Sequence, residues 1–295
     1  VDEDVCLDVR ASGVTVDGDG HRIDGVDAND SVGLRIAAPE DGTVSNVTVR
    51  NVELTDWDAG LRATARSGGA LDRVTVEGVT SASNRGIGVQ FADVDAARVV
   101  DTAARDNGAT GVLLAEPGPN SAVLDSRAEG NDGYGIVVFD APDGTVVRDS
   151  RATDNEAGGI ATANGDEDTV IRNNTATANG GDGISLSDSS APTVRDNVVR
   201  GNADAGLSGF DVRDGTFAGN ELVGNDEAGM ALRYVDDTAV RGNDVRRNGG
   251  NGIALERSDR NTVVRNVVCA NGASPPISVD ADSTDNEIRD NRQRC

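Results

Sequence analysis

The chain has 295 residues and a formal net charge of -24, with 51 acidic residues, 27 arginines and no lysine. A surface this acidic repels itself in dilute salt, and ions that screen it within a few ångströms relieve the repulsion, so the composition indicates a protein of a halophilic archaeon. It disfavours nucleic acid and anionic membranes as partners, since the sequence contains no basic patch and no basic run.

Residues 1–26 are expected to form the first coil or a cap at the N-terminal end. The chain contains no signal peptide and no apolar stretch of the roughly 20 residues that cross a bilayer. Because it begins with Val1 rather than Met, we expect that an upstream signal segment has been removed and that the protein is extracellular or on the cell surface. His21 is the single histidine, which excludes a metal centre built from several imidazoles.

Residues 27–275 carry a glycine followed by an apolar residue at an interval that shortens from 27 to 23 residues. The pairs are Gly33-Leu34, Gly60-Leu61, Gly86-Ile87, Gly111-Val112, Gly135-Ile136, Gly159-Ile160, Gly183-Ile184, Gly206-Leu207, Gly229-Met230 and Gly252-Ile253. A repeat of this length predicts a stack of equivalent units, none of which buries its apolar face alone.

Two polar columns appear when the chain is aligned on this pair. Asn tolerates left-handed backbone at a turn, and stacked Asn side chains pass hydrogen bonds from one unit to the next. We therefore expect two ladders at the corners of a coil. The first contains Thr102, Ser126, Ser150, Asn174, Asn197, Asn220, Asn243 and Asn266, and the second contains Asn107, Asn131, Asn155, Asn179, Asn202, Asn225, Asn248 and Asn271.

Between the corners the apolar residues lie two apart, as Ile184 and Leu186 do, which is the period of a strand. Two further apolar columns, which include Val99 and Ala104, imply three short strands per coil. Helical repeats need longer uninterrupted segments, and a leucine-rich repeat would be dominated by leucine. The pattern predicts an all-β, single-stranded parallel β-helix of about 10–11 coils in one domain, with residues 276–295 as the last coil and C-terminal end.

This sequence resembles the right-handed parallel β-helix repeat family, which includes pectin-lyase-like enzymes and NosD-like accessory proteins. The resemblance covers roughly residues 7–291 and rests on residues 13–23 and on units such as Gly183-Ile184-Ser185-Leu186 with Val194-Arg195-Asp196-Asn197. Polysaccharide-cleaving relatives carry a Gly-His-Gly segment with clustered aspartates, or an Asp-Pro-His-Asp segment, and some lyases use lysine. None of these is present, so an enzyme of this type would depend on Asp, Glu, Arg and Tyr.

The cysteines predict one disulfide. Cys269 and Cys295 follow the corresponding residues Asn266 and Asn291 by three and four positions, which places them on adjacent rungs. That separation suits the Cα distance of about 4.4–6.8 Å in a disulfide. We expect a bridge that staples the last coil and indicates an oxidising compartment; reduced structural cysteines are the alternative.

Aromatic residues indicate a binding edge. Four of the seven lie four or five residues after a coil's glycine, just beyond the first strand. Aromatic faces stack on sugar rings, while carboxylates and Arg bond hydroxyl groups. We therefore expect a polysaccharide or cell-surface glycan to bind there; the alternative is that the rings pack as a secondary hydrophobic cluster under an acidic coat. The expected substrate-binding residues are Phe91, Phe139, Asp140, Phe210, Asp214, Arg233 and Tyr234.

The candidates for acid-base catalysis are Asp211, Asp236 and Asp237. Residues one or two rungs apart lie about 5 or 10 Å apart, which brackets the carboxylate spacings of retaining and inverting glycosidases. Asp211 with Asp236 or Asp237, and Arg233 as a clamp, would suit a polysaccharide hydrolase, lyase or epimerase. No cofactor is expected; calcium is considered at residues 164–168 and 17–19, neither of which has a full EF-hand pattern.

The sequence thus favours an exported, salt-adapted scaffold that binds polysaccharide along one edge of the strand stack. A divergent carbohydrate-active enzyme is the first alternative. A NosD-like accessory protein, recognised by partner proteins along the strands, is the second.

Overall fold

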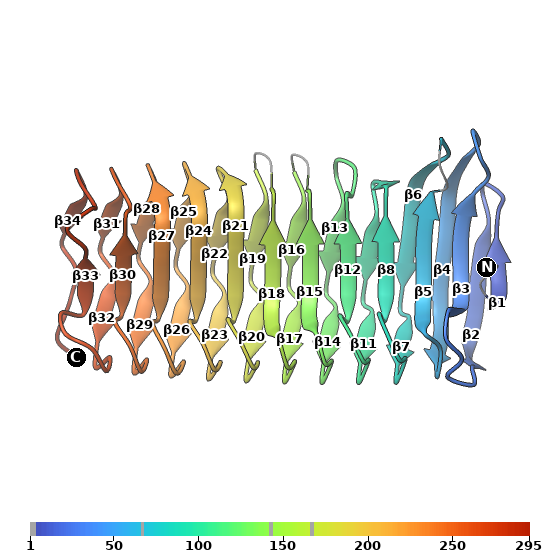
Figure 1. Cartoon of the computed structure of the whole chain (residues 1–295), viewed down its shortest axis with the longest axis horizontal. Helices are drawn as coiled ribbons and strands as arrows, with labels where there is room; N and C mark the ends of the chain where they lie inside the picture. Colours follow the sequence, from blue (N-terminus) through green and yellow to red (C-terminus); the bar gives the residue numbers. More distant parts are fainter. Residues whose placement is uncertain (1–3, 66–67, 142–143, 166–167) are drawn as a thin grey trace.

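Parallel strands coil into a straight rod with the N-terminus at one end and the C-terminus at the other (Figure 1). The computed structural model describes residues 4–65, 68–141, 144–165 and 168–295. These residues form strands and turns without a helix, and accordingly none of them belongs to a helix that could span a membrane. Twelve coils at a strand spacing of about 4.8 Å give a rod about 50 Å long.

The first face of the rod is a twelve-stranded parallel sheet in which each strand pairs with those of the neighbouring coils. Its strands are β1 (Asp4–Val9), β3 (Ser31–Ala38), β5 (Ala59–Ala65), β8 (Val89–Ala92), β12 (Val112–Ala115), β15 (Tyr134–Phe139), β18 (Gly158–Ala163), β21 (Ile184–Ser190), β24 (Leu207–Arg213), β27 (Met230–Asp236), β30 (Ile253–Glu256) and β33 (Ile277–Val279).

The other strands form the second and third faces, and the long first strands bend across both. These bent strands are β2 (Thr15–Asp24) and β4 (Thr43–Thr55). The second face contains β6 (Ala70–Glu77), β9 (Val94–Asp95), β10 (Arg98–Val100), β13 (Ala122–Leu124), β16 (Val146–Arg148), β19 (Val170–Arg172), β22 (Thr193–Arg195), β25 (Thr216–Ala218), β28 (Ala239–Arg241), β31 (Thr262–Val264) and β34 (Glu287–Arg289). The third contains β7 (Thr80–Ala82), β11 (Ala103–Arg105), β14 (Arg127–Glu129), β17 (Arg151–Thr153), β20 (Thr175–Thr177), β23 (Val198–Arg200), β26 (Glu221–Val223), β29 (Asp244–Arg246) and β32 (Val267–Cys269).

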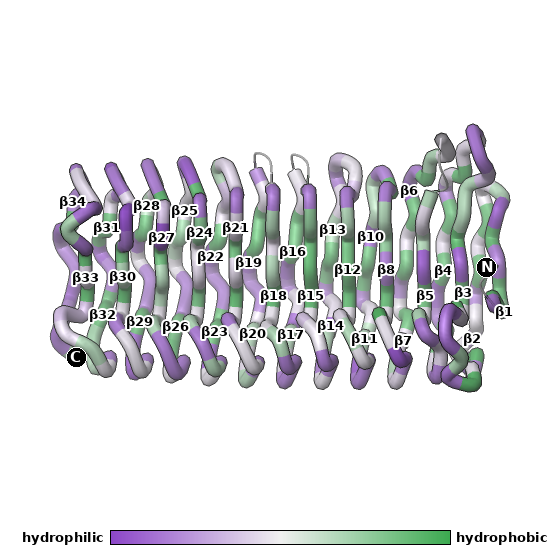
Figure 2. The backbone as a smooth tube through the Cα atoms, in the orientation of Figure 1, coloured by the Kyte–Doolittle hydropathy of each residue, from purple (hydrophilic) through white to green (hydrophobic). Residues whose placement is uncertain are grey.

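Three inward columns form one continuous core, as the two-residue spacing predicted. Ile184, Val194 and Val199 represent the columns of the three faces, and each is fully buried. In Figure 2 apolar segments lie along the strands, while the bends at the rod's edge are largely polar. The β-helix with three strands per coil is therefore confirmed, with twelve strands in the first sheet rather than ten or eleven. The additional rungs are β1 and β33, which lack the glycine that marks the others.

One repeat register was predicted incorrectly. Val89, not Ile87, pairs with Leu61 on one side and Val112 on the other, so the glycine of this coil is Gly88. The interval therefore does not shorten smoothly. It is 27 residues from Leu34 to Leu61, 28 from Leu61 to Val89 and 23 from Val89 to Val112. The coil contains two glycines that each precede an apolar residue, Gly86-Ile87 and Gly88-Val89, and the first was mistaken for the repeat.

Both ladders are present, and all of their side chains except that of the terminal Asn271 are buried. Asn197 Oδ1 accepts the backbone N–H of Asn174 at 2.9 Å, while Asn197 Nδ2 donates to Asn220 Oδ1 at 2.9 Å and to the carbonyl of Ile171 at 3.0 Å. The ladder residues do not themselves adopt left-handed backbone. The residue before each one does, as Asn173 and Asp196 show with φ of 56° and 57°. The ladder side chain thus satisfies the backbone of a sharp corner formed by its predecessor.

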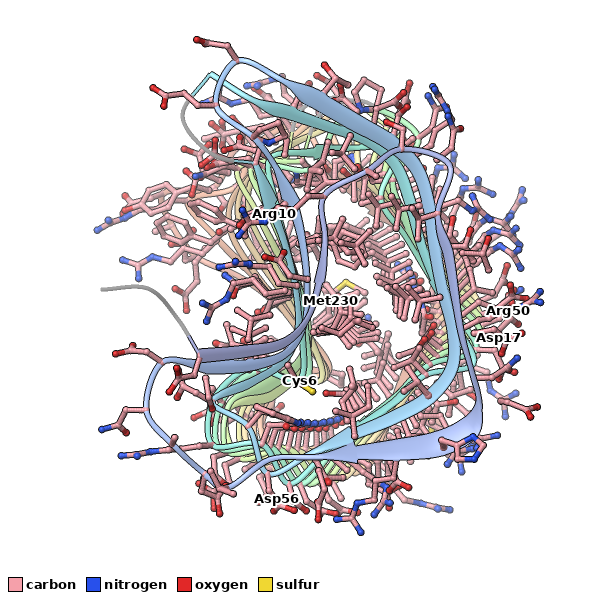
Figure 3. The ribbon with its side chains drawn as sticks, turned by 90° about the vertical axis from the view of Figure 1, so that its right-hand side faces the viewer. Cys6, Arg10, Asp17, Arg50, Asp56 and Met230 are labelled. Atoms are coloured by element: carbon pink, nitrogen blue, oxygen red, sulfur yellow. A yellow bond between two sulfur atoms is a disulfide. The ribbon has the colours of Figure 1, made fainter. Side chains whose placement is uncertain are left out.

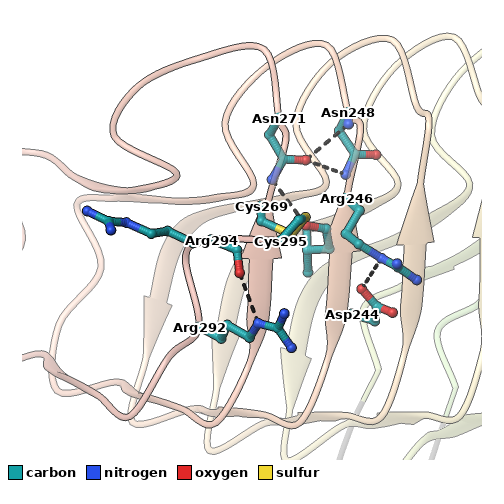
Figure 4. Close-up of a disulfide and its surroundings, with 9 residues drawn as sticks. Asp244, Arg246, Asn248, Cys269, Asn271, Arg292, Arg294 and Cys295 are labelled. Atoms are coloured by element: carbon teal, nitrogen blue, oxygen red, sulfur yellow. Dashed lines mark hydrogen bonds and ion pairs between the residues drawn. A yellow bond between two sulfur atoms is a disulfide. The ribbon is translucent and has the colours of Figure 1, made fainter.

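The final coil is closed by a disulfide between Cys269, at the end of β32, and Cys295 (Figure 4). Their Cα atoms are 5.7 Å apart. Beside the bridge, Asn248 donates from its side-chain nitrogen to Asn271 Oδ1 at 3.0 Å, so the second ladder ends at the same place. Cys6 in β1 is free and exposed.

Candidate functional site

The carboxyl-end edge of the first sheet brings together most of the predicted aromatic residues. Phe139 and Phe210 lie in the same outward column, with Ala163 and Ser187 between them. Three rungs, or about 14 Å, therefore separate the two rings. Both are partly exposed, at 39% and 45%. The predicted strip is consequently interrupted by small residues rather than continuous.

Phe91 does not belong to this edge. It is fully buried in β8, where it pairs with Ala63 and Leu114 of the adjacent coils. The prediction failed because the glycine of this coil was taken as Gly86 rather than Gly88, which placed Phe91 beyond the end of the first strand; it lies three residues after Gly88, on the inward side of β8. Its ring is part of the core, and we remove it from the binding residues.

Four residues from β24, β27 and the turn after β30 form a compact group, which we call the aromatic–arginine cluster: Phe210, Arg233, Tyr234 and Arg257. The rings of Phe210 and Tyr234 meet edge to face with centroids 5.5 Å apart. The guanidinium carbons of Arg233 and Arg257 lie 5.3 and 5.7 Å from the Tyr234 centroid, within cation–π range. Arg257 also donates to the Tyr234 hydroxyl at 2.5 Å. Both rings are therefore held in place before any ligand arrives.

The backbone at this edge accounts for the position of Tyr234. It belongs to a column of left-handed residues that lie within the last part of successive strands of the first sheet or directly after them, and its own φ is 55°. Most of the column is Asp, Asn or Glu, whereas a bulky aromatic residue is uncommon in this conformation. The column contains Asp93, Glu116, Asp140, Asn164, Asp188, Asp211, Tyr234 and Arg257. Tyrosine here breaks the local preference, as residues at binding sites often do.

The two arginines also change the acidity of the cluster. The hydrogen bond from Arg257, assisted by the nearby positive charge of Arg233, lowers the pKa of the Tyr234 hydroxyl. Elsewhere in the same column, the negative charges of Asp93 and Asp140 and partial burial raise the pKa of Glu116. The edge therefore changes along the rod from a carboxylate column to an arginine-rich cluster.

Asp182 is a candidate that the sequence analysis did not single out. It precedes β21, and its Oδ2 accepts a hydrogen bond from the Ser208 hydroxyl at 2.5 Å, while Oδ1 accepts the N–H of Ala205 at 3.0 Å. Burial raises the pKa of this carboxyl despite the two hydrogen bonds. Ser208 and Phe210 lie two apart on β24 and so project on the same side. Asp182 thus borders the outer surface on which the aromatic–arginine cluster lies; the only sequence signal was its position between Gly181 and Gly183.

The three predicted catalytic aspartates are engaged with arginines. Asp211 is 3.2 Å from Arg213. Asp237 receives two hydrogen bonds from Arg260, at 2.9 and 2.8 Å, and these lower the pKa of its carboxyl. Asp236 accepts the backbone N–H of Asp259 at 2.8 Å. Asp214 lies exposed on the turn after β24.

The rungs therefore do not pair Asp211 with the other two carboxylates. Its partner across β27 is Tyr234, because Phe210 pairs with Arg233. Asp236 pairs instead with Arg213, and Asp214 and Asp237 follow on the turns. The lowered pKa of Asp237 makes its carboxyl poorly suited to donate a proton, whereas burial raises the pKa of Asp182, which is the better general-acid candidate on this face.

The two segments considered for calcium offer little support for a site. At residues 17–19, the Asp17 carboxylate is occupied by Arg50 and Asn51. Within 164–168, residues 166 and 167 lie outside the described part of the chain, and Asn164 donates to Asp140 at 2.8 Å. Among the described residues, no group of three or more His, Cys, Asp or Glu side chains is arranged to hold a metal ion.

Comparisons with known proteins agree on the architecture. The family model described as right handed beta helix region matches residues 12–176 and 137–293. The A-module of the Azotobacter vinelandii mannuronan C-5 epimerase AlgE4 is 18% identical with a TM-score of 0.68, over 99% of this chain and 91% of that one. The periplasmic alginate epimerase AlgG is 14% identical with a TM-score of 0.66, over 99% and 79%.

A third similar structure is the Dettilon tailspike protein, which is 16% identical with a TM-score of 0.59, over 96% of this chain and 58% of that one. No curated protein matches the sequence. Identities this low establish a shared fold and leave the chemistry of the site to be argued from this chain's own residues.

Proposed function

The chain belongs to the right-handed β-helix family, and we propose that it is an exported, salt-adapted scaffold that binds a polysaccharide chain across the outer surface of the first sheet. The observation that carries the proposal is the aromatic–arginine cluster. Two rings in fixed orientation offer stacking surfaces, and Arg233 adds an exposed guanidinium beside them. Binding to groups already held in place loses little conformational entropy.

The surface between Asp182 and the cluster also suits an extended sugar chain. The outward column through β21, β24, β27 and β30 consists of small residues, namely Ser185, Ser208, Ala231 and Ala254. Small side chains allow a flat ligand to approach the sheet closely, while the hydroxyl groups and the Asp182 carboxylate can bond to sugar hydroxyls. Two of the similar structures are named as epimerases of alginate or mannuronan, which is consistent with a polysaccharide ligand.

The proposal is tested by measuring binding in molar salt to a panel of alginate, polygalacturonate, xylan and dextran. We expect Phe210→Ala/Tyr234→Asn to weaken binding at least about tenfold, because both stacking surfaces are lost. Asn is chosen at position 234 because it tolerates the left-handed backbone. Tyr134→Ala is the matched control, since it removes an exposed ring that is not among the expected binding residues. A double variant that binds every polysaccharide as tightly as the unaltered protein would refute this site.

Polysaccharide hydrolysis, lysis or epimerisation is the second candidate function, and Asp182 is the observation that favours it. A carboxyl with a raised pKa on a ligand-binding surface is suited to act as a general acid. The same incubations are therefore assayed for reducing ends, for unsaturated products and for altered uronate composition. If the protein forms a product, and Asp182→Asn abolishes its formation but not binding, the protein is an enzyme that uses Asp182. Binding without any product would support the function of a binding scaffold.

A further inference from the structure

The outer side of the second face carries a column of arginines. Arg148, Arg172 and Arg195 end β16, β19 and β22 and are direct register partners. After Ala218 the column resumes with Arg241 on β28. Successive guanidinium groups therefore start from positions about 4.8 Å apart along the rod. The expectation that the chain has no basic patch was wrong, because the coil brings together arginines that lie 23 or 24 residues apart in the sequence.

Several of these charges have no acidic partner. Arg148 and Arg195 each pair with the aspartate that follows, at 2.5 and 2.7 Å. Arg172 is followed by Asn173 and forms no direct ion pair within the described part of the chain, although its charge helps to lower the pKa of Asp149. Like charges directly opposite each other weaken a sheet. Acidic residues outnumber arginines 51 to 27 in this chain. An arginine that lies between two others without a direct ion pair therefore indicates a surface that can accept an anion.

These arginines line two grooves that adjoin at Arg195. The first, of about 600 Å³, is lined by Arg98, Arg148, Arg172 and Arg195, with polar groups from Asn120, Ser121 and Thr193. The second, of about 390 Å³, continues past Arg195 to Arg241 and Arg265. Together they extend across eight rungs from β10 to β31, about 35 Å along the rod. In the end-on view of Figure 3, blue nitrogen atoms gather outside the wall that bears Arg50, a residue of this same face.

We propose that this arginine groove binds a linear anionic polysaccharide, carboxylated or sulfated, lying parallel to the rod. The guanidinium fork bonds two oxygens of a carboxylate or sulfate at once. A small anion would need one or two arginines, whereas arginines on three successive rungs, followed by Arg241 beyond Ala218, match a polymer that carries a charge on each sugar. Asn120, Ser121 and Thr193 add donors and acceptors for hydroxyl groups.

The same surface is less suited to nucleic acid. Single-stranded nucleic acid is usually held by aromatic side chains on which the bases stack, and the residues lining both grooves include none. Duplex DNA carries one charge per roughly 1.7 Å of axis, and it would meet the carboxylates of Asp149 and Asp196 beside the arginines. A sugar chain carries fewer charges, and its hydroxyl groups can donate to these carboxylates.

The site is independent of the aromatic–arginine cluster, so the experiment uses Phe210→Ala/Tyr234→Asn as its background. In this background, binding of polygalacturonate, alginate and dextran sulfate is measured by titration calorimetry over a range of potassium chloride concentrations, with dextran and a single-stranded oligonucleotide for comparison. Arg148→Ala/Arg172→Ala/Arg195→Ala is added to remove the groove. Arg10→Ala/Arg22→Ala/Arg247→Ala is the matched control, because it removes the same charge outside the groove.

We expect the background protein and the control to bind at least one anionic polysaccharide, with an affinity that falls as salt rises because bound counterions are released. The groove variant should bind at least about 100-fold more weakly and with a smaller salt slope, since several charge-assisted hydrogen bonds are lost. Its melting temperature serves as the check on folding. Equal binding by a folded groove variant, equal loss in the control, absence of binding to all three polyanions, or tighter binding to the oligonucleotide would each overturn the proposal.

Discussion

Replacing Asn197 by Ala tests the physical basis of the fold most directly. The Asn197 side chain is buried and makes four hydrogen bonds that connect three successive coils. Alanine fills the corner without a polar group, so the backbone N–H of Asn174 loses its acceptor and the carbonyl of Ile171 loses a donor. The neighbouring amides keep other partners, because Asn174 Nδ2 still donates to Val147 and Asn220 Oδ1 still accepts the N–H of residue 197.

The expected loss of stability follows from these partners. An orphaned buried donor costs roughly 1–3 kcal/mol, and a lost hydrogen bond whose partners are otherwise satisfied costs about 1 kcal/mol. We therefore expect Asn197→Ala to lower the free energy of unfolding by about 2–4 kcal/mol. Asn29→Ala is the control, since Asn29 is exposed and outside both ladders, and its cost should stay below about 0.5 kcal/mol.

The assay is urea unfolding in molar potassium chloride, followed by far-ultraviolet circular dichroism. The high salt keeps charge repulsion constant between variants, and urea adds no ions of its own. A midpoint for Asn197→Ala that equals the midpoint of Asn29→Ala would refute the reasoning, because it would mean that the corner backbone finds other partners without the ladder.

Three other expectations test the surface and the ends of the rod. Dialysis into dilute buffer should unfold the protein as screening is lost, and an unchanged circular dichroism spectrum there would contradict salt adaptation. Iodoacetamide applied to the unreduced protein should label Cys6 and spare Cys269 and Cys295; labelling of all three would exclude the disulfide in solution. Since burial raises the folded-state pKa of Asp182, its contribution to stability falls as pH rises through that value. Asp182→Asn should therefore raise the free energy of unfolding at neutral pH, and this gain should vanish below the ordinary carboxyl pKa of 3.8. An equal gain at neutral pH and below pH 3.8 would argue against a raised pKa.

The local corner conformation shows how close sequence reasoning comes and where it stops. The asparagine columns predicted the ladders because a repeated residue in a solenoid must occupy a repeated place. The sequence alone did not say which residue bends the chain. The structure assigns left-handed backbone to the preceding position, where Asp, Asn and Gly predominate but Arg265 also occurs with φ of 56°. The hydrogen bonds of the ladder are what allow that position to vary.

Phe91 and Phe210 illustrate the limit for side chains. Both follow a coil's glycine at nearly the same distance, yet one is in the core and the other on the surface. Phe91 lies three residues after Gly88 and Phe210 four residues after Gly206, and a difference of one residue reverses the side of the strand to which a side chain points. Since β8 belongs to a coil with two candidate glycines, only the pairing of Val89 with Leu61 and Val112 decided where Phe91 points.

The repeats in the sequence alone determined the parallel β-helix, its three apolar columns, the ladders and the adjacent-rung positions of Cys269 and Cys295. Only the tertiary structure decided which side chains of different coils meet. The contacts of Tyr234 with Phe210 and Arg257, the buried environment of Asp182, and the stacking of Arg148, Arg172 and Arg195 arise between residues more than 20 positions apart. The physical reason is that a coil's period fixes which rungs are neighbours, while the exact register and the turns fix which side chains meet.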